Sequence, residues 1–278
     1  MQESSLTQPL VSVVIPTRNS EATIEKCLRS LAEQSYKNLE VIVVDNYSGD
    51  RTREVAKHYG VKICLKGPER SAQVNFGAEK AVGKYIYRVD SDFVLQPDVI
   101  REAVESCERE GYDAILIHNT SDPTVSFWAR VRKAERDCYK NDKLNVAARF
   151  WKKEVFLAVG GFDETLVAGD DYDLQNRLVK SSFKIGRINA GETHIGEPKT
   201  LAEVVRKHYY YGKNMGSFIR KDPRKALRQL SPLRESYAKG LSNFFSDPIL
   251  IVGFVIYQLV RYTAATIGII SREKRGFM

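Results

Sequence analysis

The feature that most constrains this chain is the regular alternation of short apolar runs with helical segments over residues 11–89. Runs rich in β-branched residues predict strands at 11–15, 41–44, 61–65 and 85–89. Segments of about ten residues with helical periodicity lie between them, the first expected to be capped by Ser20 and the third predicted at 73–82. This alternation predicts an α/β fold, with a mostly parallel, doubly wound sheet covered by helices on both faces.

Acidic residues follow two of the predicted strands. Asp45 ends the second strand, and Asp90-Ser91-Asp92 follows the fourth. Ligands of such sheets bind beyond the carboxyl ends of the strands. Residues two apart on a strand share a side, so Asp90 and Asp92 can offer two carboxylates to one divalent cation. The alternative is that these residues are ordinary loop or capping carboxylates.

Five motifs follow one another in a specific order along residues 9–215. They occupy residues 13–19, 43–46, 90–92, 160–164 and 169–174. Together they resemble glycosyltransferase family 2, whose members are inverting enzymes with a nucleotide-sugar-binding GT-A fold. The chain departs from the family pattern at Tyr47, where a small residue is usual, and at Asp170-Asp171, where the family has Glu-Asp.

The resemblance implies roles for the carboxylates. Asp171 matches the catalytic base that takes the proton of the acceptor, with Asp170 as the next candidate. Asp90 and Asp92 would hold a divalent metal, Mg²⁺ or Mn²⁺, that neutralises charge on the leaving diphosphate. His194 is either a further metal ligand or a structural histidine. Asp170 can alternatively stabilise the dipole of the helix that begins there.

The resemblance also implies a donor site at the same edge of the sheet. Asp45 would contact the nucleobase, and Arg70 would either pair with the diphosphate or lie in a solvated loop. The residues expected to bind the nucleotide sugar are Pro16, Thr17, Asn19, Asp45, Arg70, Asn75, Asp90 and Ser91.

Composition limits the class of protein. With 278 residues and 43% apolar content, the chain is long enough for one sizeable core and an appendage. Its four cysteines lie more than thirty residues apart without a Cys-x-x-Cys motif, which argues against a zinc or redox site. We expect reduced thiols, a cytosolic catalytic domain and, because the first ten residues are polar, no signal peptide.

Basic charge is concentrated in one segment. Residues 199–239 contain eleven Lys and Arg but three acidic residues, and this net +8 equals the net charge of the chain. Such a segment suits nucleic acid or an anionic membrane surface. Residues 249–270 form a largely apolar run that can cross about 30 Å of hydrocarbon. We therefore expect the membrane, and no nucleic acid, as a partner.

The apolar run has one polar face. Gln258, Arg261, Ala265 and Gly268 share that face, and an arginine at the membrane centre costs about 2.5–3.5 kcal/mol. The helix is expected either to pack this face on another helix or to lie partly in the interface. A second amphipathic stretch at 127–133 is predicted either to touch the membrane or to pack near the acceptor site.

These observations divide the chain into three parts. Residues 1–215 are predicted to form the GT-A domain, 216–247 a basic amphipathic juxtamembrane segment, and 248–278 a hydrophobic membrane helix with a short basic tail. The excess of basic charge before the apolar run predicts a cytoplasmic catalytic domain at the membrane.

The predicted function is transfer of one sugar from a nucleotide-sugar donor to a lipid-linked acceptor, either a polyprenyl phosphate or a polyprenyl-linked glycan. The Gln-x-x-Arg-Trp motif of processive synthases is absent around residues 206–212, which argues against polymer synthesis. One alternative is a membrane-attached transferase acting on a soluble or protein acceptor. Another is a nucleotide-sugar-binding assembly partner without turnover. A nucleotidyltransferase is disfavoured, because residues 17–20 form no glycine-rich loop.

Overall fold

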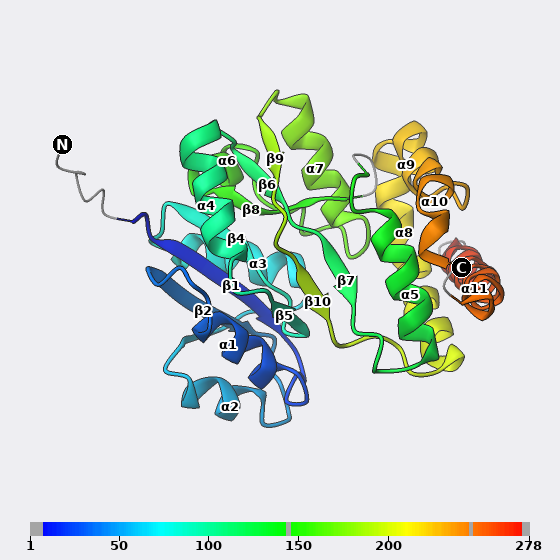
Figure 1. Cartoon of the computed structure of the whole chain (residues 1–278), viewed down its shortest axis with the longest axis horizontal. Helices are drawn as coiled ribbons and strands as arrows, with labels where there is room; N and C mark the ends of the chain where they lie inside the picture. The colour runs from blue at the N-terminus through cyan, green and yellow to red at the C-terminus, as the bar shows by residue number, and fades with distance from the viewer. Residues whose placement is uncertain (1–7, 143–145, 245–246, 274–278) are drawn as a thin grey trace.

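The computed structural model describes residues 8–142, 146–244 and 247–273, which form two sheets enclosed by helices (Figure 1). The main sheet has seven strands in the order β3-β2-β1-β4-β8-β6-β9. They are β1 (Val11–Thr17), β2 (Leu39–Asp45), β3 (Lys62–Leu65), β4 (Tyr85–Arg88), β6 (Ala114–Leu116), β8 (Ala148–Lys152) and β9 (Ile185–Arg187). Neighbouring strands are parallel except at β8, which runs antiparallel to β4 and β6. The expected mostly parallel α/β sheet is confirmed.

A smaller sheet lies beside the main one and has the order β5-β10-β7. Its strands are β5 (Phe93–Leu95), β7 (Asn119–Ser121) and β10 (Glu192–His194). In the register of this sheet, His194 lies opposite Phe93 on one side and Ser121 on the other. The small sheet therefore brings His194 to the loop that follows β4.

Helices cover both faces of the main sheet because its buried side chains alternate. Val13 and Ile15 pack with residues of α1 (Ile24–Ala32), α2 (Thr52–His58) and α4 (Val99–Glu110). Val14 packs on the other face with residues of α3 (Arg70–Lys80), α6 (Lys153–Ala158) and α7 (Asp170–Lys180). β1 is therefore buried from both sides, as a central strand of a doubly wound sheet must be.

Two local predictions are wrong. Helix α3 begins at Arg70 rather than at 73, so Arg70 lies in its first turn and not in a loop. Ser20 does not cap α1 through its side chain. Its backbone carbonyl accepts a hydrogen bond of 2.9 Å from the amide of Ile24, while Thr23 occupies the cap position.

Helix α5 (Phe127–Cys138) and the C-terminal helices form a helical layer against the small sheet (Figure 1). The C-terminal helices are α8 (Leu201–Lys221), α9 (Pro223–Gln229), α10 (Glu235–Lys239), the 3-10 helix η1 (Leu241–Phe244) and α11 (Pro248–Glu273). A separate buried cluster joins α5, α8 and α11 through Val131, Val204 and Tyr257. Position 215, the predicted end of the first domain, lies inside α8, and the three-part division of the chain stays a prediction.

The predicted polar face of the apolar helix packs on neighbouring helices. Arg261 Nη1 lies 2.9 Å from Oε1 of Glu135, a fully buried carboxylate on α5, and Gln258 donates a hydrogen bond of 3.3 Å to the hydroxyl of Tyr237. α11 is also the one helix of the described residues that is long and apolar enough to cross a membrane. The expectation that this face meets another helix is confirmed.

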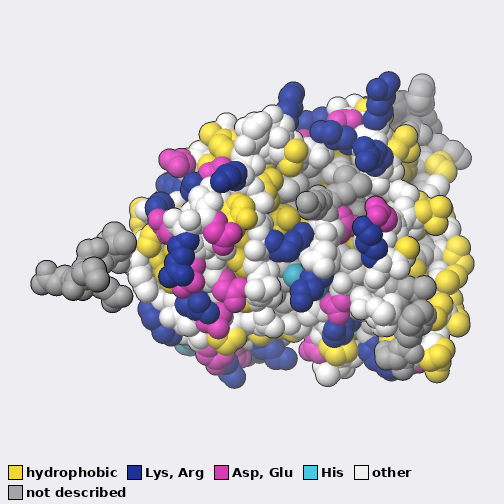
Figure 2. All heavy atoms as spheres, turned by 45° about the horizontal axis from the view of Figure 1, so that its top comes forward, with side chains coloured by type: hydrophobic (Ala, Val, Ile, Leu, Met, Phe, Trp, Pro, Cys, Tyr) yellow, Lys and Arg dark blue, Asp and Glu magenta, His cyan; other side chains and the backbone are white. Residues whose placement is uncertain are grey.

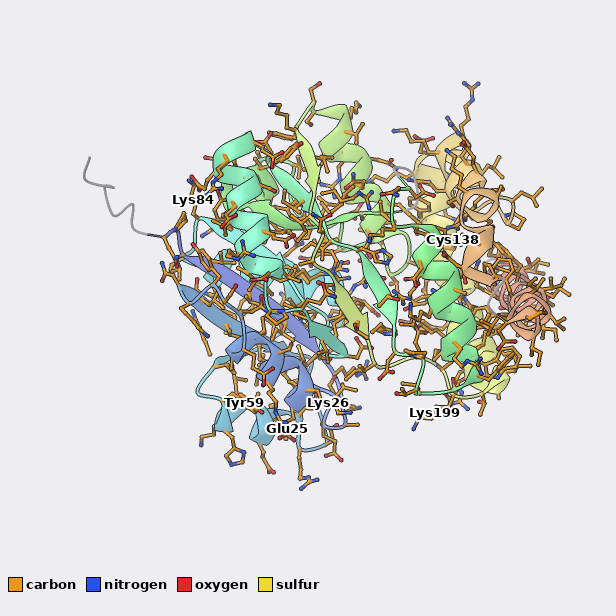
Figure 3. All side chains as sticks on the ribbon, in the orientation of Figure 1. Glu25, Lys26, Tyr59, Lys84, Cys138 and Lys199 are labelled. Carbon is orange, nitrogen blue, oxygen red and sulfur yellow. The ribbon has the colours of Figure 1, made fainter. Side chains whose placement is uncertain are left out.

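All four cysteines are free thiols, and three of them are buried. Figure 3 labels Cys138 at the end of α5, close to α10. Its Sγ donates a hydrogen bond to the carbonyl of Gly240 at 3.5 Å. Cys27, Cys107 and Cys138 are therefore packed in the interior.

Candidate active site

A cavity of about 540 Å³ opens at the carboxyl ends of β1 and β4, between the main sheet and the C-terminal helices. Its walls come from the loops after these strands and from the first turns of α3 and α7, with further side chains from β10, α5 and α8. Of the predicted site residues, the cavity is lined by Pro16, Thr17, Arg70, Asp90, Ser91, Asp92, Asp171 and His194.

The two consecutive aspartates enter the site through the start of α7. Gly169 precedes the helix at φ +81°, a left-handed conformation that side-chain-bearing residues rarely adopt. After this turn, Asp170 and Asp171 share Arg70 but have different second partners. Asp170 is buried and accepts hydrogen bonds from Arg70 at 2.7 Å and from the hydroxyl of Ser71 at 3.0 Å. Asp170 thus holds Arg70, whereas Asp171 is the aspartate that lines the cavity.

Asp171 lies between two arginines. It accepts a short hydrogen bond from Arg88, a buried residue of β4, and one of 3.2 Å from Arg70. Burial alone would raise the pKa of Asp171, but the charges of Arg88 and Arg70 outweigh it and lower the pKa to about 2. Asp171 is therefore ionised at neutral pH and able to accept a proton.

Asp90 shares Arg88 with Asp171 and also pairs with Arg149. Its Oδ2 lies 3.1 Å from Nη2 of Arg149, and Arg149 Nε lies 3.2 Å from the buried Glu192. Burial raises the pKa of Glu192. Burial would also raise the pKa of Asp90, but Arg88 and Arg149 hold it well below its usual range. Buried arginine side chains therefore place fixed positive charge next to Asp90.

Asp92 faces the small sheet. Its Oδ2 lies 2.9 Å from Nε2 of His194, and the Nδ1 of this histidine lies 2.8 Å from Glu197, which is buried. Arg136 Nε lies 3.0 Å from the same carboxylate. Burial opposes ionisation of Glu197, but Arg136 outweighs it and holds the pKa of Glu197 well below its usual range. Glu197 thereby fixes the imidazole ring and directs its Nε2 edge at Asp92.

The donor chemistry of this corner fits a divalent cation. Asp92 and His194 lie together, and Asp90 Oδ1 is a buried oxygen that accepts no hydrogen bond among the described residues, although Arg88 Nε lies 3.5 Å from it. In that part of the chain, no three His, Cys, Asp or Glu side chains form a ready-made metal cluster. Mg²⁺ needs only one or two protein carboxylates, because water and substrate phosphates complete its shell.

Three predicted donor residues lie outside the cavity lining. Asp45 is fully buried, and its carboxylate accepts a 2.8 Å hydrogen bond from the amide of Ser48. Asn19 accepts a 3.0 Å hydrogen bond from the amide of Gly49. Asn75 binds the backbone of Phe162 through both its amide nitrogen and its oxygen. In the structure, these three side chains shape the loops around the site.

The sequence reasoning missed several residues of the site. Arg88, Arg149 and Arg136 line the cavity as buried or nearly buried cations, and Lys207 and Tyr211 of α8 close its far side. The signal was present for Arg88, an arginine in the apolar strand directly before the Asp-Ser-Asp motif. Arg136 and Lys207 carry no such signal, because only the packing of α5 and α8 brings them to the cavity.

Comparison with known proteins gives consistent matches. The model of the family described as Glycosyl transferase family 2 matches residues 12–167. Succinoglycan biosynthesis protein ExoA of Rhizobium meliloti is 28% identical over 263 residues, which cover 84% of this chain and 77% of that protein. Glycosyltransferase AglE of Haloferax volcanii is 27% identical over 229 residues, which cover 74% and 73% of the two chains.

Solved structures share the fold. The mannosyltransferase PcManGT from Pyrobaculum calidifontis, in complex with GDP-Man and Mn²⁺, aligns with a TM-score of 0.65 and 17% identity, over 96% of this chain and 88% of that one. Residues 1–349 of TarS from S. aureus, in complex with UDP, align with a TM-score of 0.55 and 17% identity, over 92% and 90%. These likenesses confirm the expected GT-A fold.

Proposed function

This chain belongs to glycosyl transferase family 2, and on that premise we propose that it transfers a sugar from a nucleotide-sugar donor with inversion. The observation that carries the proposal is the position of Asp171. Its ionised carboxylate lines the cavity opposite the Asp90–Asp92 loop and is held by Arg88 and Arg70. A carboxylate and several arginines around one cavity suit a diphosphate leaving group and a proton-bearing nucleophile.

In the proposed reaction, an acceptor oxygen forms a bond to the anomeric carbon as the bond from that carbon to the diphosphate oxygen breaks. The acceptor proton passes to Asp171, and the nucleoside diphosphate departs. A base with a pKa of about 2 is weak, so donor binding must strengthen it. The half-exposed Arg70 lies within reach of both Asp171 and the cavity. A diphosphate that draws Arg70 away would raise the pKa of Asp171.

We further propose that a divalent metal, Mg²⁺ or Mn²⁺, acts with the donor. Asp92, His194 and Asp90 would hold it, and when bound it would neutralise charge on the departing diphosphate. Arg149 keeps Asp90 ionised and oriented, and Glu197 orients the ring of His194. Mn²⁺ or Mg²⁺ accompanies the nucleotide in several solved relatives of this fold.

The acceptor is proposed to be lipid-linked, with the catalytic domain on the cytoplasmic side of a membrane. α8 supports this proposal because one of its sides lines the cavity and another contacts α11. Lys207 and Tyr211 face the cavity, while Gly212 on the same helix contacts α11, whose outer surface is apolar. A lipid-borne acceptor therefore has a short path from that surface to the cavity. The remaining predicted donor residues, Asp45, Asn19 and Asn75, would act by shaping the loops.

The experiment that tests the proposed reaction is a screen of nucleotide sugars. Donor hydrolysis and thermal protection of the purified full chain are measured with Mn²⁺, with Mg²⁺ and with chelator. We expect one nucleotide class to protect the protein, and more strongly with metal. Protection by none of the nucleotide sugars would refute the donor site. Binding without hydrolysis or transfer to any acceptor would instead favour the assembly-partner alternative.

A further inference from the structure

The outer surface of α11 is largely apolar, with the exposed Thr263 and Thr266 between its two apolar stretches. The apolar side chains on it are 38–65% exposed: Ile249, Ile251, Val252, Val255, Ile256, Leu259, Ile267 and Ile270. In Figure 2 hydrophobic side chains gather along the right edge of the molecule, where α11 lies. Exposure of so large an apolar surface to water is unfavourable, so this surface is marked as an interaction face.

The inner surface of α11 is fixed to the domain at several points. A side-chain carbon at Gly212 of α8 would lie 2.1 Å from the carbonyl oxygen of Ala265, so the two helices touch backbone to backbone. The same closeness recurs at Gly268, where a side-chain carbon would lie 2.4 Å from the Tyr209 carbonyl. Between these contacts and the start of the helix, Arg261 binds the buried Glu135. The helix is thus docked along its length.

This docking is incompatible with crossing a bilayer. If α11 crossed while still docked, α8 would enter the hydrocarbon together with Arg206, Lys207 and Lys213. If α11 left the domain first, Glu135 would lose Arg261, and Arg261 itself would enter the membrane unpaired. A helix that lies flat needs neither change, because its inner face stays on the protein and its outer face meets lipid.

We propose that α11 lies in the plane of an anionic bilayer surface, with its outer face at the boundary between headgroups and acyl chains, and does not span the membrane. Basic charge adjoins the apolar face. Tyr262 donates a hydrogen bond of 3.1 Å to the carbonyl of Ser231, just beyond α9. α9 has no acidic residue, and it exposes Arg224, Lys225 and Arg228. Cationic residues beside an apolar helix face are the pattern that anionic lipid surfaces bind.

The inference rests on the proposed function only for the presence of a membrane, and it specifies how the protein meets it. α8 separates the lipid-facing helix from the cavity by one helix diameter, with Lys207 and Tyr211 on the cavity side. An in-plane α11 therefore keeps the cavity at the membrane surface, within reach of an acceptor headgroup.

The test uses the full chain bound to sealed vesicles of phosphatidylcholine and phosphatidylglycerol. Cysteines are placed at the two ends of α11, as Pro248→Cys and Ser271→Cys, in a Cys64→Ser background that removes the partly exposed native thiol. A membrane-impermeant maleimide is added outside. We expect both ends to react without detergent. Reaction at one end, with the other protected until detergent is added, would show a spanning helix and overturn the proposal.

A second measurement tests the lipid-facing side. An environment-sensitive fluorophore on Leu259→Cys should shift to the blue on vesicles, while the same label on Lys26→Cys, an exposed α1 position far from α11, should not (Figure 3). Leu259→Asp should release the protein from vesicles, whereas Val82→Asp, which changes an apolar residue that is exposed at least as much elsewhere, should not. An unshifted fluorophore at 259 would refute the lipid contact. Donor hydrolysis in solution, measured on the same samples, reports separately on the proposed reaction.

Discussion

Replacing Asp171 by Asn tests the proposed base most directly, because the amide keeps the shape of the side chain but cannot accept a proton. A positioned general base contributes about 10²–10⁴ to the rate, so we expect kcat for transfer to fall by that factor. This loss corresponds to roughly 3–5 kcal/mol of barrier. Donor affinity should not fall, since a neutral amide competes less than Asp171 with the diphosphate for Arg70, which keeps its partner Asp170 at 2.7 Å.

The same substitution has a cost in stability that follows from the pKa. Arg88 and Arg70, working against burial, lower the pKa of Asp171 from 3.8 to about 2. At 1.36 kcal/mol per unit, ionised Asp171 contributes a net stabilisation of about 2 kcal/mol at neutral pH, after the opposing effect of burial. Because the native pKa is depressed, this contribution is present above about pH 4 and is lost as the pH falls through 2. Asp171→Asn should therefore destabilise the protein at pH 7, and the difference should shrink towards pH 2.

Asp163 provides a matched control. Its pKa is also lowered to about 2 against the effect of burial, by hydrogen bonds from Lys221 and Thr165, yet it does not line the cavity. Asp163→Asn should lose a similar free energy of unfolding in denaturant titrations while keeping transfer activity. If Asp171→Asn retains the kcat of the unchanged protein in a radiolabelled transfer assay, Asp171 is not the base. If both variants lose activity equally, the loss comes from stability alone.

Further outcomes follow from the same geometry. Asp92→Ala should weaken Mn²⁺ binding in the presence of nucleoside diphosphate, measured by calorimetry, and abolish transfer; full activity of this variant in chelator would remove the metal from the site. Activity should be lost at acid pH as Asp171 becomes protonated. This loss should occur at higher pH in the kcat profile than in the kcat/KM profile, because the bound donor draws Arg70 away and raises the pKa of Asp171. Loss at the same pH in both profiles would contradict the proposed effect of donor binding. Gly212→Ala should lower the melting temperature, since its new carbon would lie 2.1 Å from the Ala265 carbonyl, whereas Gly216→Ala, which meets only a flexible side chain at 3.4 Å, should not.

The central strands and the order of the motifs could be predicted from sequence because their signals are local. β1 and β2 are runs of β-branched residues, and Asp45 ends β2 as expected. β8 was not predicted, although its antiparallel insertion between β4 and β6 decides the shape of the sheet. β8 reads Ala-Arg-Phe-Trp-Lys, which lacks the run of β-branched residues that marks β1 and β2. The three-residue strands of the small sheet are too short to show alternation.

The candidate site also contains residues that the sequence predicts and residues that it does not. The acidic residues stand in recognisable motifs, so Asp92 and Asp171 could be predicted as cavity residues, and the cavity contains both. The arginines that set their charge come from other elements. Arg149 lies on the unpredicted β8, and Arg136 lies on α5, which sequence reasoning left open between membrane and core. Electrostatic partners supplied by tertiary packing cannot be found from spacing along the chain.

Helix α11 shows what the sequence pattern alone does not determine. The shared face of Gln258, Arg261, Ala265 and Gly268 indicated that this helix needed a polar partner, but not which one. The partner of Arg261 is Glu135, 126 residues earlier. Once this pair is known, the choice between a spanning and an in-plane helix depends on the energy of separating buried charges and no longer on length or hydropathy.

The proposed base and the proposed membrane contact together constrain the acceptor. A polyprenyl phosphate carries negative charge near neutral pH, because the second pKa of a phosphate monoester is about 6, so its oxygen could attack without a base. A sugar hydroxyl needs one, and Asp171 is placed to serve it. On the side of the cavity nearest α11 lie Lys207 and Arg136, which suit a phosphate. A polyprenyl-linked glycan offers both groups: a sugar hydroxyl that can lie towards Asp171, and a phosphate that can lie towards α5 and α8. Among the lipid-linked acceptors, we therefore infer that the glycan fits this site better than the bare polyprenyl phosphate.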